Sequence, residues 1–192
     1  MRWDNLSLCD ALRAGKLAVM PTDTIYGIVG SAFDEAAVNR IYQARQRAPA
    51  KPCIILIGDL AELEKFSIKL SKDEKRKLKE YWLAPSGVEG SGPASVILDC
   101  LDDKFSYLHR GTKSLAFRIP QDAEFRNFLI RTGPLIAPSA NLEGRLPAKN
   151  ITEAKNYFGD SVDLYIDAGE ITGEPSRVIK LHKDGTTSIL RE

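Results

Sequence analysis

Two short turns in the sequence place hydroxyl, carboxylate and amide side chains directly after apolar segments. The first has the sequence PTDT at residues 21–24, and the second has the sequence PSAN at residues 138–141. Small residues at such positions let a ligand approach the backbone, while the polar side chains offer hydrogen bonds to it. Each turn also has a structural interpretation, as a helix N-cap for residues 21–24 and as an ordinary turn for residues 138–141.

Arginines near these turns favour a binding function. Arg45 lies on the apolar stripe of the helix predicted over residues 34–47, where a guanidinium group needs an anionic partner. Arg118 lies inside the apolar strand predicted over residues 115–119, so it requires a buried carboxylate or a bound anion. Guanidinium groups match phosphoryl oxygens, and several of them near small-residue turns indicate phosphate binding. Arg191 follows the last predicted strand, where a solvated tail is the alternative.

Common catalytic motifs are absent. The sequence contains no GxxxxGK[ST], GxGxxG or GxSxG motif. His109 and His182 do not have the spacing of metal ligands, and the latter is interpreted as a surface or hairpin residue. The three cysteines, Cys9, Cys53 and Cys100, form no CxxC pair, and we interpret them as buried thiols in a reducing compartment. These absences disfavour a metal hydrolase and a catalytic triad.

The elements that must position these residues follow from periodicity, caps and turn residues. Helices are predicted over residues 5–13, 34–47, from 59 onward, 71–82, 122–131 and 152–159. Strands are predicted over residues 17–20, 53–57, 94–98, 115–119, 135–137, 164–167, 178–181 and 187–190, the last two as a hairpin, with an exposed loop at 85–93. Helices and strands interleave without a strict βαβ repeat. We therefore expect an α/β fold, with a twisted mixed-direction sheet and packed helices, in a single domain over residues 1–192.

Composition limits the function classes further. Of the 192 residues, 27 are Lys or Arg and 26 are Asp or Glu, so a net charge of +1 excludes a grossly basic nucleic-acid binder but not a local basic patch. Lysines crowd residues 65–79, which is typical of a solvated amphipathic helix. No apolar run reaches the length of about 18 residues needed to span a bilayer. Asp4 and Asp10 interrupt the N-terminal region where a signal peptide needs an apolar run, so we predict a cytoplasmic protein without membrane contact.

The combination of these segments resembles the TsaC/YrdC family of threonylcarbamoyl-AMP synthases over nearly the whole chain. Residues 21–28 match the family's PT[ED]TxYGL-like opening, and residues 45–52 match its KxRxxxKP-like segment. The sequence FRIP at 117–120 matches an xRxP strand, and residues 139–141 match the SAN turn. Further matches are DAG at 167–169, PSRV at 175–178 and the closing Arg191.

The resemblance implies a YrdC-like fold with a concave basic ligand cavity and an ATP-dependent nucleotidyltransferase activity. Family members condense L-threonine, bicarbonate or CO2, and ATP to threonylcarbamoyl-AMP and diphosphate. That product is used for threonylcarbamoyladenosine modification of tRNA. The implied partners are the three substrates, tRNA and the downstream threonylcarbamoyl-transferase proteins, and the implied cofactor is Mg²⁺ with ATP. Such chemistry depends on positioning and charge neutralisation, which suits arginines.

The resemblance also implies roles for individual residues. Arg45 and Arg47 occupy the catalytic positions, with Arg45 at the family's lysine. Thr24, Arg118 and Ser176 are expected to bind threonine. The residues expected to bind ATP or line its pocket are Arg47, Lys51, Ser114, Ala137, Ser139, Asn141 and Arg191.

Three departures from the family pattern keep alternatives open. Arg45 replaces the family lysine, Arg177 replaces a threonine, and residues 83–91 expand the family's compact WPGP turn. One alternative is a non-catalytic double-stranded RNA- or tRNA-binding protein of the same fold. The other is a paralogue that adenylates a different carbamate.

Overall fold

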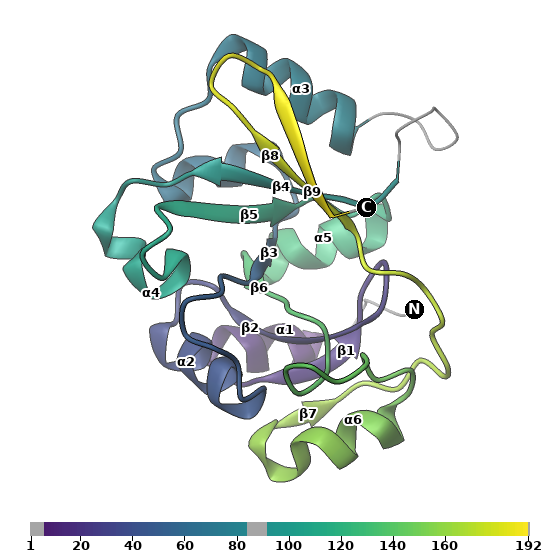
Figure 1. Cartoon of the computed structure of the whole chain (residues 1–192). Coiled ribbons are helices and arrows are strands. Elements are labelled where there is room, and N and C mark those ends of the chain that lie inside the picture. The colour runs from purple at the N-terminus through teal and green to yellow at the C-terminus, as the bar shows by residue number, and fades with distance from the viewer. Residues whose placement is uncertain (1–5, 84–91, 192) are drawn as a thin grey trace.

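The computed structural model describes residues 6–83 and 92–191. The strands of this part of the chain form one sheet, in the order β7-β1-β2-β6-β3-β5-β4-β8-β9 (Figure 1). Their bounds are β1 Ala18–Pro21, β2 Tyr26–Ser31, β3 Ile54–Leu56, β4 Ala94–Asp99, β5 Ser114–Arg118, β6 Leu135–Ile136, β7 Leu164–Tyr165, β8 Arg177–Leu181 and β9 Thr187–Arg191. Three neighbouring pairs are parallel, namely β1/β7, β3/β5 and β4/β8, and the others are antiparallel. The predicted mixed-direction α/β sheet and the hairpin of its last two strands are confirmed.

Helices pack on both faces of the sheet and bury two hydrophobic clusters. The helices are α1 Leu6–Arg13, α2 Glu35–Ala44, α3 Lys72–Trp82, α4 Ser106–His109, α5 Ala123–Thr132 and α6 Ile151–Phe158, with 3-10 turns at Leu60–Phe66, Asp103–Phe105 and Gly159–Ser161. One cluster joins α1 and α5 to the sheet, and the larger one lies under α2, α3, α4 and α6. Asp34 and Ser71, the first residues of two predicted helices, cap α2 and α3 as expected, and Asp122 caps α5.

Several boundaries differ from the prediction, each for a local reason. The helix that begins after Asp34 ends at Ala44 instead of residue 47, because Gln46 has a φ of 51°, outside the helical region. The helix predicted over residues 152–159 with Thr152 as its cap instead runs over Ile151–Phe158, and Asn150 caps it by accepting a hydrogen bond from Glu153 N. The short helices of residues 103–109 were not predicted. The predicted loop at 85–93 falls mostly outside the described residues.

Strand β2 is the most consequential element that the sequence did not predict. It pairs with β1 in antiparallel register, with Pro21 opposite Tyr26, so residues 22–25 form the turn of a hairpin. Its YGIVGS sequence is buried along almost its whole length and therefore lacks the polar–apolar alternation of a half-exposed strand. The helix N-cap interpretation of residues 21–24 is wrong, because a strand follows them.

Two exposed features agree with the sequence interpretation. Helix α3 buries Leu78 and Trp82 and exposes basic residues, some paired within the helix, such as Arg76 with Glu80. His182 is exposed and hydrogen-bonds Ser188 across the β8–β9 hairpin. Across residues 6–83 and 92–191, no helix has the length and apolar character needed to cross a bilayer.

Candidate functional site

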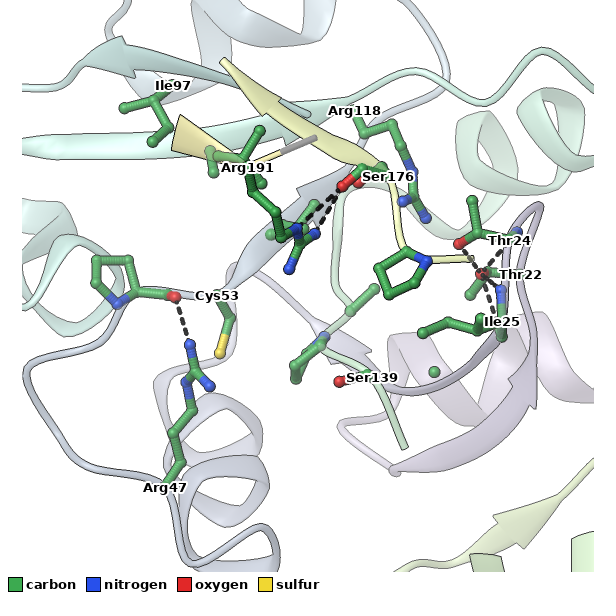
Figure 2. Close-up of a pocket in the computed structure, with 18 of the residues that line it drawn as sticks. Thr22, Thr24, Ile25, Arg47, Cys53, Ile97, Arg118, Ser139, Ser176 and Arg191 are labelled. Carbon is green, nitrogen blue, oxygen red and sulfur yellow. Dashed lines mark hydrogen bonds between the residues drawn. The ribbon is translucent and has the colours of Figure 1, made fainter. Parts of the chain in front are cut away.

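A cavity of about 390 Å³ opens where the β1–β2 turn, the segment after α2 and the segment after β6 meet the sheet. Figure 2 shows Arg47 and Cys53 at one end, Thr24 and Arg118 at the other, and Ser139 and Arg191 between them. The lining therefore combines most of the residues that the sequence singled out. Those present are Thr24, Arg45, Arg47, Ser114, Arg118, Ala137, Ser139, Ser176 and Arg191.

The β1–β2 turn is fixed by one hydroxyl group. Thr22 Oγ1 donates to Ile25 O at 2.7 Å and accepts from the main-chain N–H groups of Thr24 and Ile25, each at 3.3 Å. Thr24 Oγ1 lies 3.2 Å from Thr22 Oγ1 and lines the cavity. The turn thus presents Thr24 to a ligand while Thr22 holds the backbone.

Arg118 and Asp23 form a buried ion pair beside this turn. Arg118 Nη2 lies 2.9 Å from Asp23 Oδ1, and the two side chains are 5% and 10% exposed. Burial lowers the pKa of Arg118, and the Asp23 charge opposes that shift. The sequence interpretation of a buried salt bridge at Arg118 is confirmed. Arg118 Nε has no hydrogen-bond partner among the described residues, so a donor remains for a ligand in the cavity that Arg118 lines.

Arg47 lines the cavity and hydrogen-bonds the main chain of the loop that follows it. Its Nε donates to Lys51 O at 3.0 Å and its Nη2 donates to Pro52 O at 2.9 Å. Lys51 does not line the cavity: its ammonium group pairs with Glu143, and its side chain is 62% exposed. Lys51 and Ala48 N–H together lower the pKa of the Glu143 carboxyl group. The structure therefore separates Arg47 from Lys51, which the resemblance had placed on the same ligand.

Arg45 lies in the cavity wall, and Asn141 lies behind it. Arg45 is 3% exposed, and within residues 6–83 and 92–191 its hydrogen-bond partners include no carboxylate, contrary to the predicted need for an anion. Its guanidinium group instead donates to neutral oxygens of Asn141 and Ser139. Burial lowers the pKa of Arg45. Asn141 is not part of the lining, although the resemblance had placed it there.

The segment of residues 167–176, here called the strap, lies in the connection from β7 to β8 (Figure 1). Its last residue, Ser176, lines the cavity. The hydroxyl group of the buried Tyr26 accepts from Ala168 N at 2.8 Å and donates to Gly169 O at 2.9 Å. At the other end, Ser176 Oγ lies 2.8 Å from Ser95 Oγ. Arg191 donates from Nη2 to Ser176 O at 2.7 Å, so it is part of the site and not a solvated tail.

We expect Gly173→Ala to raise the KM for the ligand at Thr24 about tenfold. A Cβ atom at Gly173 would lie 2.1 Å from Thr24 O, so the strap or the turn has to move. A displacement of about 1 Å lowers the reaction rate up to about 100-fold when it moves the reacting groups. In Gly173→Ala the displacement moves only a residue expected to bind the ligand, so the expected effect is smaller. Steady-state kinetics measures this change in KM. Glu174→Ala, at the exposed neighbouring residue, is the control, and equal kinetics for both variants would contradict the prediction.

Part of the lining was not predicted from the sequence. Cys53 lines the cavity, and burial raises the pKa of its thiol despite the nearby Arg47 charge, so the group stays protonated and is no activated nucleophile. All three cysteines are free and buried, as expected. Thr22 and Pro138 belong to the two turns singled out in the sequence, and Ile25, Tyr26 and Gly27 belong to the segment of residues 21–27 that was predicted to form a wall of the site. The other lining residues, for which no role was predicted, are Pro52, Ile54, Ile97, Thr112, Ala116, Pro175 and Val178. Arg177, which replaces the family threonine, lies outside this lining.

The charged side chains that line the described part of the cavity are all positive. Among the described residues that line it, four are arginines and none is a carboxylate. Such a wall suits a polyanion. Mg²⁺ sites in proteins ordinarily use one or two carboxylates, and no cluster of His, Cys, Asp or Glu able to hold a metal occurs in the described part of the chain. The cavity therefore does not fit an Mg²⁺ ion that the protein itself holds. The Mg²⁺ predicted from the resemblance would enter the cavity bound to ATP.

Comparison with known proteins gives consistent matches. The family model Sua5/yciO/yrdC, described as "Telomere recombination", matches residues 10–192. The threonylcarbamoyl-AMP synthase of Chromohalobacter salexigens is 31% identical, over 92% of this chain and 91% of that protein. The crystal structure of Pyrococcus abyssi Sua5 complexed with L-threonine matches with a TM-score of 0.81 and 26% identity, over 100% of this chain.

This chain spans only about half of the Pyrococcus abyssi protein, namely 54% of it. The crystal structure of Escherichia coli YciO matches with a TM-score of 0.79 and 25% identity, over 97% of this chain and 87% of that one. Both structures share the mixed sheet and its helices with this protein. The chain belongs to the Sua5/YciO/YrdC family.

Proposed function

We propose that the protein is an L-threonylcarbamoyladenylate synthase, which condenses L-threonine, bicarbonate or CO2, and ATP to threonylcarbamoyl-AMP and diphosphate. The observation that carries the proposal is the cavity, whose described lining has four arginines and no carboxylate and which is flanked at one end by the hydroxyl groups of Thr24 and Ser176. Relatives named threonylcarbamoyl-AMP synthase support it, as does the relative complexed with L-threonine.

The layout of the cavity supports a division of labour. Threonine would bind at the end formed by Thr24, Arg118 and Ser176, and the ATP phosphates would bind toward Arg47 and Arg191 (Figure 2). The threonine amine and bicarbonate form a carbamate and water. A carbamate oxygen then bonds to the α-phosphorus, and the bond to the diphosphate leaving group breaks. Fixed guanidinium groups stabilise the charge that develops on the phosphoryl oxygens during this step.

Omitting each substrate in turn tests the proposal. We expect diphosphate release only when threonine, bicarbonate and ATP are all present, with Mg²⁺ supplied throughout. A screen of other amino acids under the same conditions tests the alternative paralogue, which Arg45 and Arg177 keep open. Faster turnover with serine or another amine would favour that paralogue, and release without any amine would contradict both.

The RNA-binding alternative gains little from the structure. Acidic residues of α3 partly neutralise the basic residues of the same helix, because Arg76 and Lys77 both form ion pairs with Glu80. Filter binding of tRNA across salt concentrations tests it, since phosphate contacts give a steep salt dependence. Steep binding without threonine-dependent turnover would favour an RNA-binding module. The cytoplasmic location and the contacts with tRNA and threonylcarbamoyl-transferase proteins stay predictions.

A further inference from the structure

Arg45 is held in the cavity wall by neutral oxygens that come mainly from one residue. Its Nε donates to Asn141 O at 3.0 Å, and its Nη2 donates to Asn141 Oδ1 at 3.0 Å and to Ser139 Oγ at 3.4 Å. Arg45 Nη1 has no partner among the described residues, although it is buried in a side chain that lines the cavity. Buried donors are ordinarily satisfied, so this group is available to a ligand oxygen.

The amide of Asn141 has no capacity left for a ligand of its own. Its Oδ1 accepts from Arg45 and from Ser139 Oγ, the latter at 2.6 Å. Its Nδ2 donates to Leu142 O at 2.7 Å and to Arg145 O at 2.8 Å. A primary amide has two N–H donors and two lone pairs on its oxygen, and all four are used. Asn141 is also only 6% exposed.

From this geometry we infer that Asn141 is a positioning residue, which fixes Arg45 so that Nη1 meets the anionic substrate and which does not itself bind the nucleotide. The inference rests on the proposed function for the identity of that substrate.

Main-chain contacts hold the same two segments together. Glu143 N donates to Arg45 O at 2.9 Å, and the Glu143 carboxylate accepts from Ala48 N and Lys51 Nζ. These bonds therefore join the segment after α2 to the segment after β6 independently of the contact between the Arg45 guanidinium group and Asn141. Because of this second attachment, we expect the backbone of both segments to keep its conformation in Asn141→Ala.

The choice of neutral acceptors has an electrostatic consequence. Asp23 compensates much of the charge of Arg118, whereas no carboxylate contacts the guanidinium group of Arg45 in the described residues. Arginine stays protonated even when burial lowers its pKa. Arg45 thus keeps its charge for the ligand. A lysine has no Nε donor to match Asn141 O, so Arg45→Lys is expected to lose activity even though it restores the residue usual in the family.

A double-mutant cycle tests the inference. Asn141→Ala is expected to lower kcat for threonine-dependent diphosphate release about 10- to 100-fold, with the KM for threonine within about twofold, because misplaced charged groups act on the reacting phosphate. In the Arg45→Ala background the same change is expected to have less than about a twofold effect. Ser114→Ala is the control, since this lining residue is not among the partners of Arg45 and should cost the same in both backgrounds.

Chemical rescue gives a readout that a merely structural role would not move. Free guanidinium is expected to restore part of the activity of Arg45→Gly but not that of Arg45→Gly/Asn141→Ala. Equal losses from Asn141→Ala in both backgrounds, or no loss in either, would overturn the inference.

Failure of the proposed function is distinguishable from failure of this inference. If the unaltered protein releases no diphosphate from threonine, bicarbonate and ATP, the function proposal fails. The same cycle is then measured as affinity for Mg-ATP by calorimetry, with melting temperatures confirming that each variant is folded. Coupling between the two changes supports the positioning role there, and strict additivity overturns it.

Discussion

Arg118→Met is expected to lower the free energy of unfolding by about 3–5 kcal/mol, because it leaves the Asp23 carboxylate buried without its cation. Domains of this kind have total stabilities of about 5–15 kcal/mol, so the loss is a large fraction of the whole. The substitution keeps the side-chain volume roughly constant, which limits the contribution of a new cavity to the loss of stability. Equilibrium unfolding in urea measures the change directly.

The matched control separates the charge from the packing. Asp23→Asn/Arg118→Met removes both charges, and replacing both partners of a buried ion pair is often near neutral. We therefore expect the double variant to recover at least half of the lost stability while staying inactive, since the donor at Arg118 Nε is gone. If the double variant is as unstable as Arg118→Met, packing explains the effect, and the ion pair contributes little to stability.

Local patterns in the sequence were sufficient for much of the fold and for most of the site. Asp34 and Ser71 cap helices where the sequence predicted them, because a capping side chain bonds only to its own first turn. Arg118 could be identified as partnered because a charge within an apolar strand cannot stay unpaired. The resemblance then brought Thr24, Ser139, Ser176 and Arg191 into one set, and the cavity contains all four.

Other features depend on contacts between distant segments, which no local pattern contains. Lys51 resembles a phosphate ligand in the sequence, but Glu143 lies 92 positions away and pairs with it. Arg45 was expected to need an anion, yet Asn141 supplies two oxygens from 96 positions away. Strand β2 was missed because its almost wholly buried YGIVGS sequence has no polar–apolar alternation, and because one of its two partners, β6, is far from it in the sequence.

Arg47→Ala is expected to lower threonine-dependent turnover by about 100- to 1,000-fold, the range found when a fixed donor to a developing charge is removed. The guanidinium group of Arg47 lines the cavity, and its bonds to Lys51 O and Pro52 O fix its direction. Initial rates of diphosphate release measure the effect. Arg47→Lys keeps the charge without the fork and should recover only a small part of the activity.

Lys51→Ala provides the contrast that decides between two accounts of this segment. The resemblance places Lys51 on the ATP phosphates, whereas the structure pairs it with Glu143 at an exposed position. Loss of an exposed ion pair costs only about 0–1 kcal/mol of stability. Because Lys51 also does not line the cavity, we expect only a few-fold loss of turnover for Lys51→Ala. A loss as large as that of Arg47→Ala would mean that the lysine leaves Glu143 and reaches the nucleotide when ATP binds. A loss of a few-fold would assign the charge at this end of the cavity to Arg47, with Lys51 acting on the loop through Glu143.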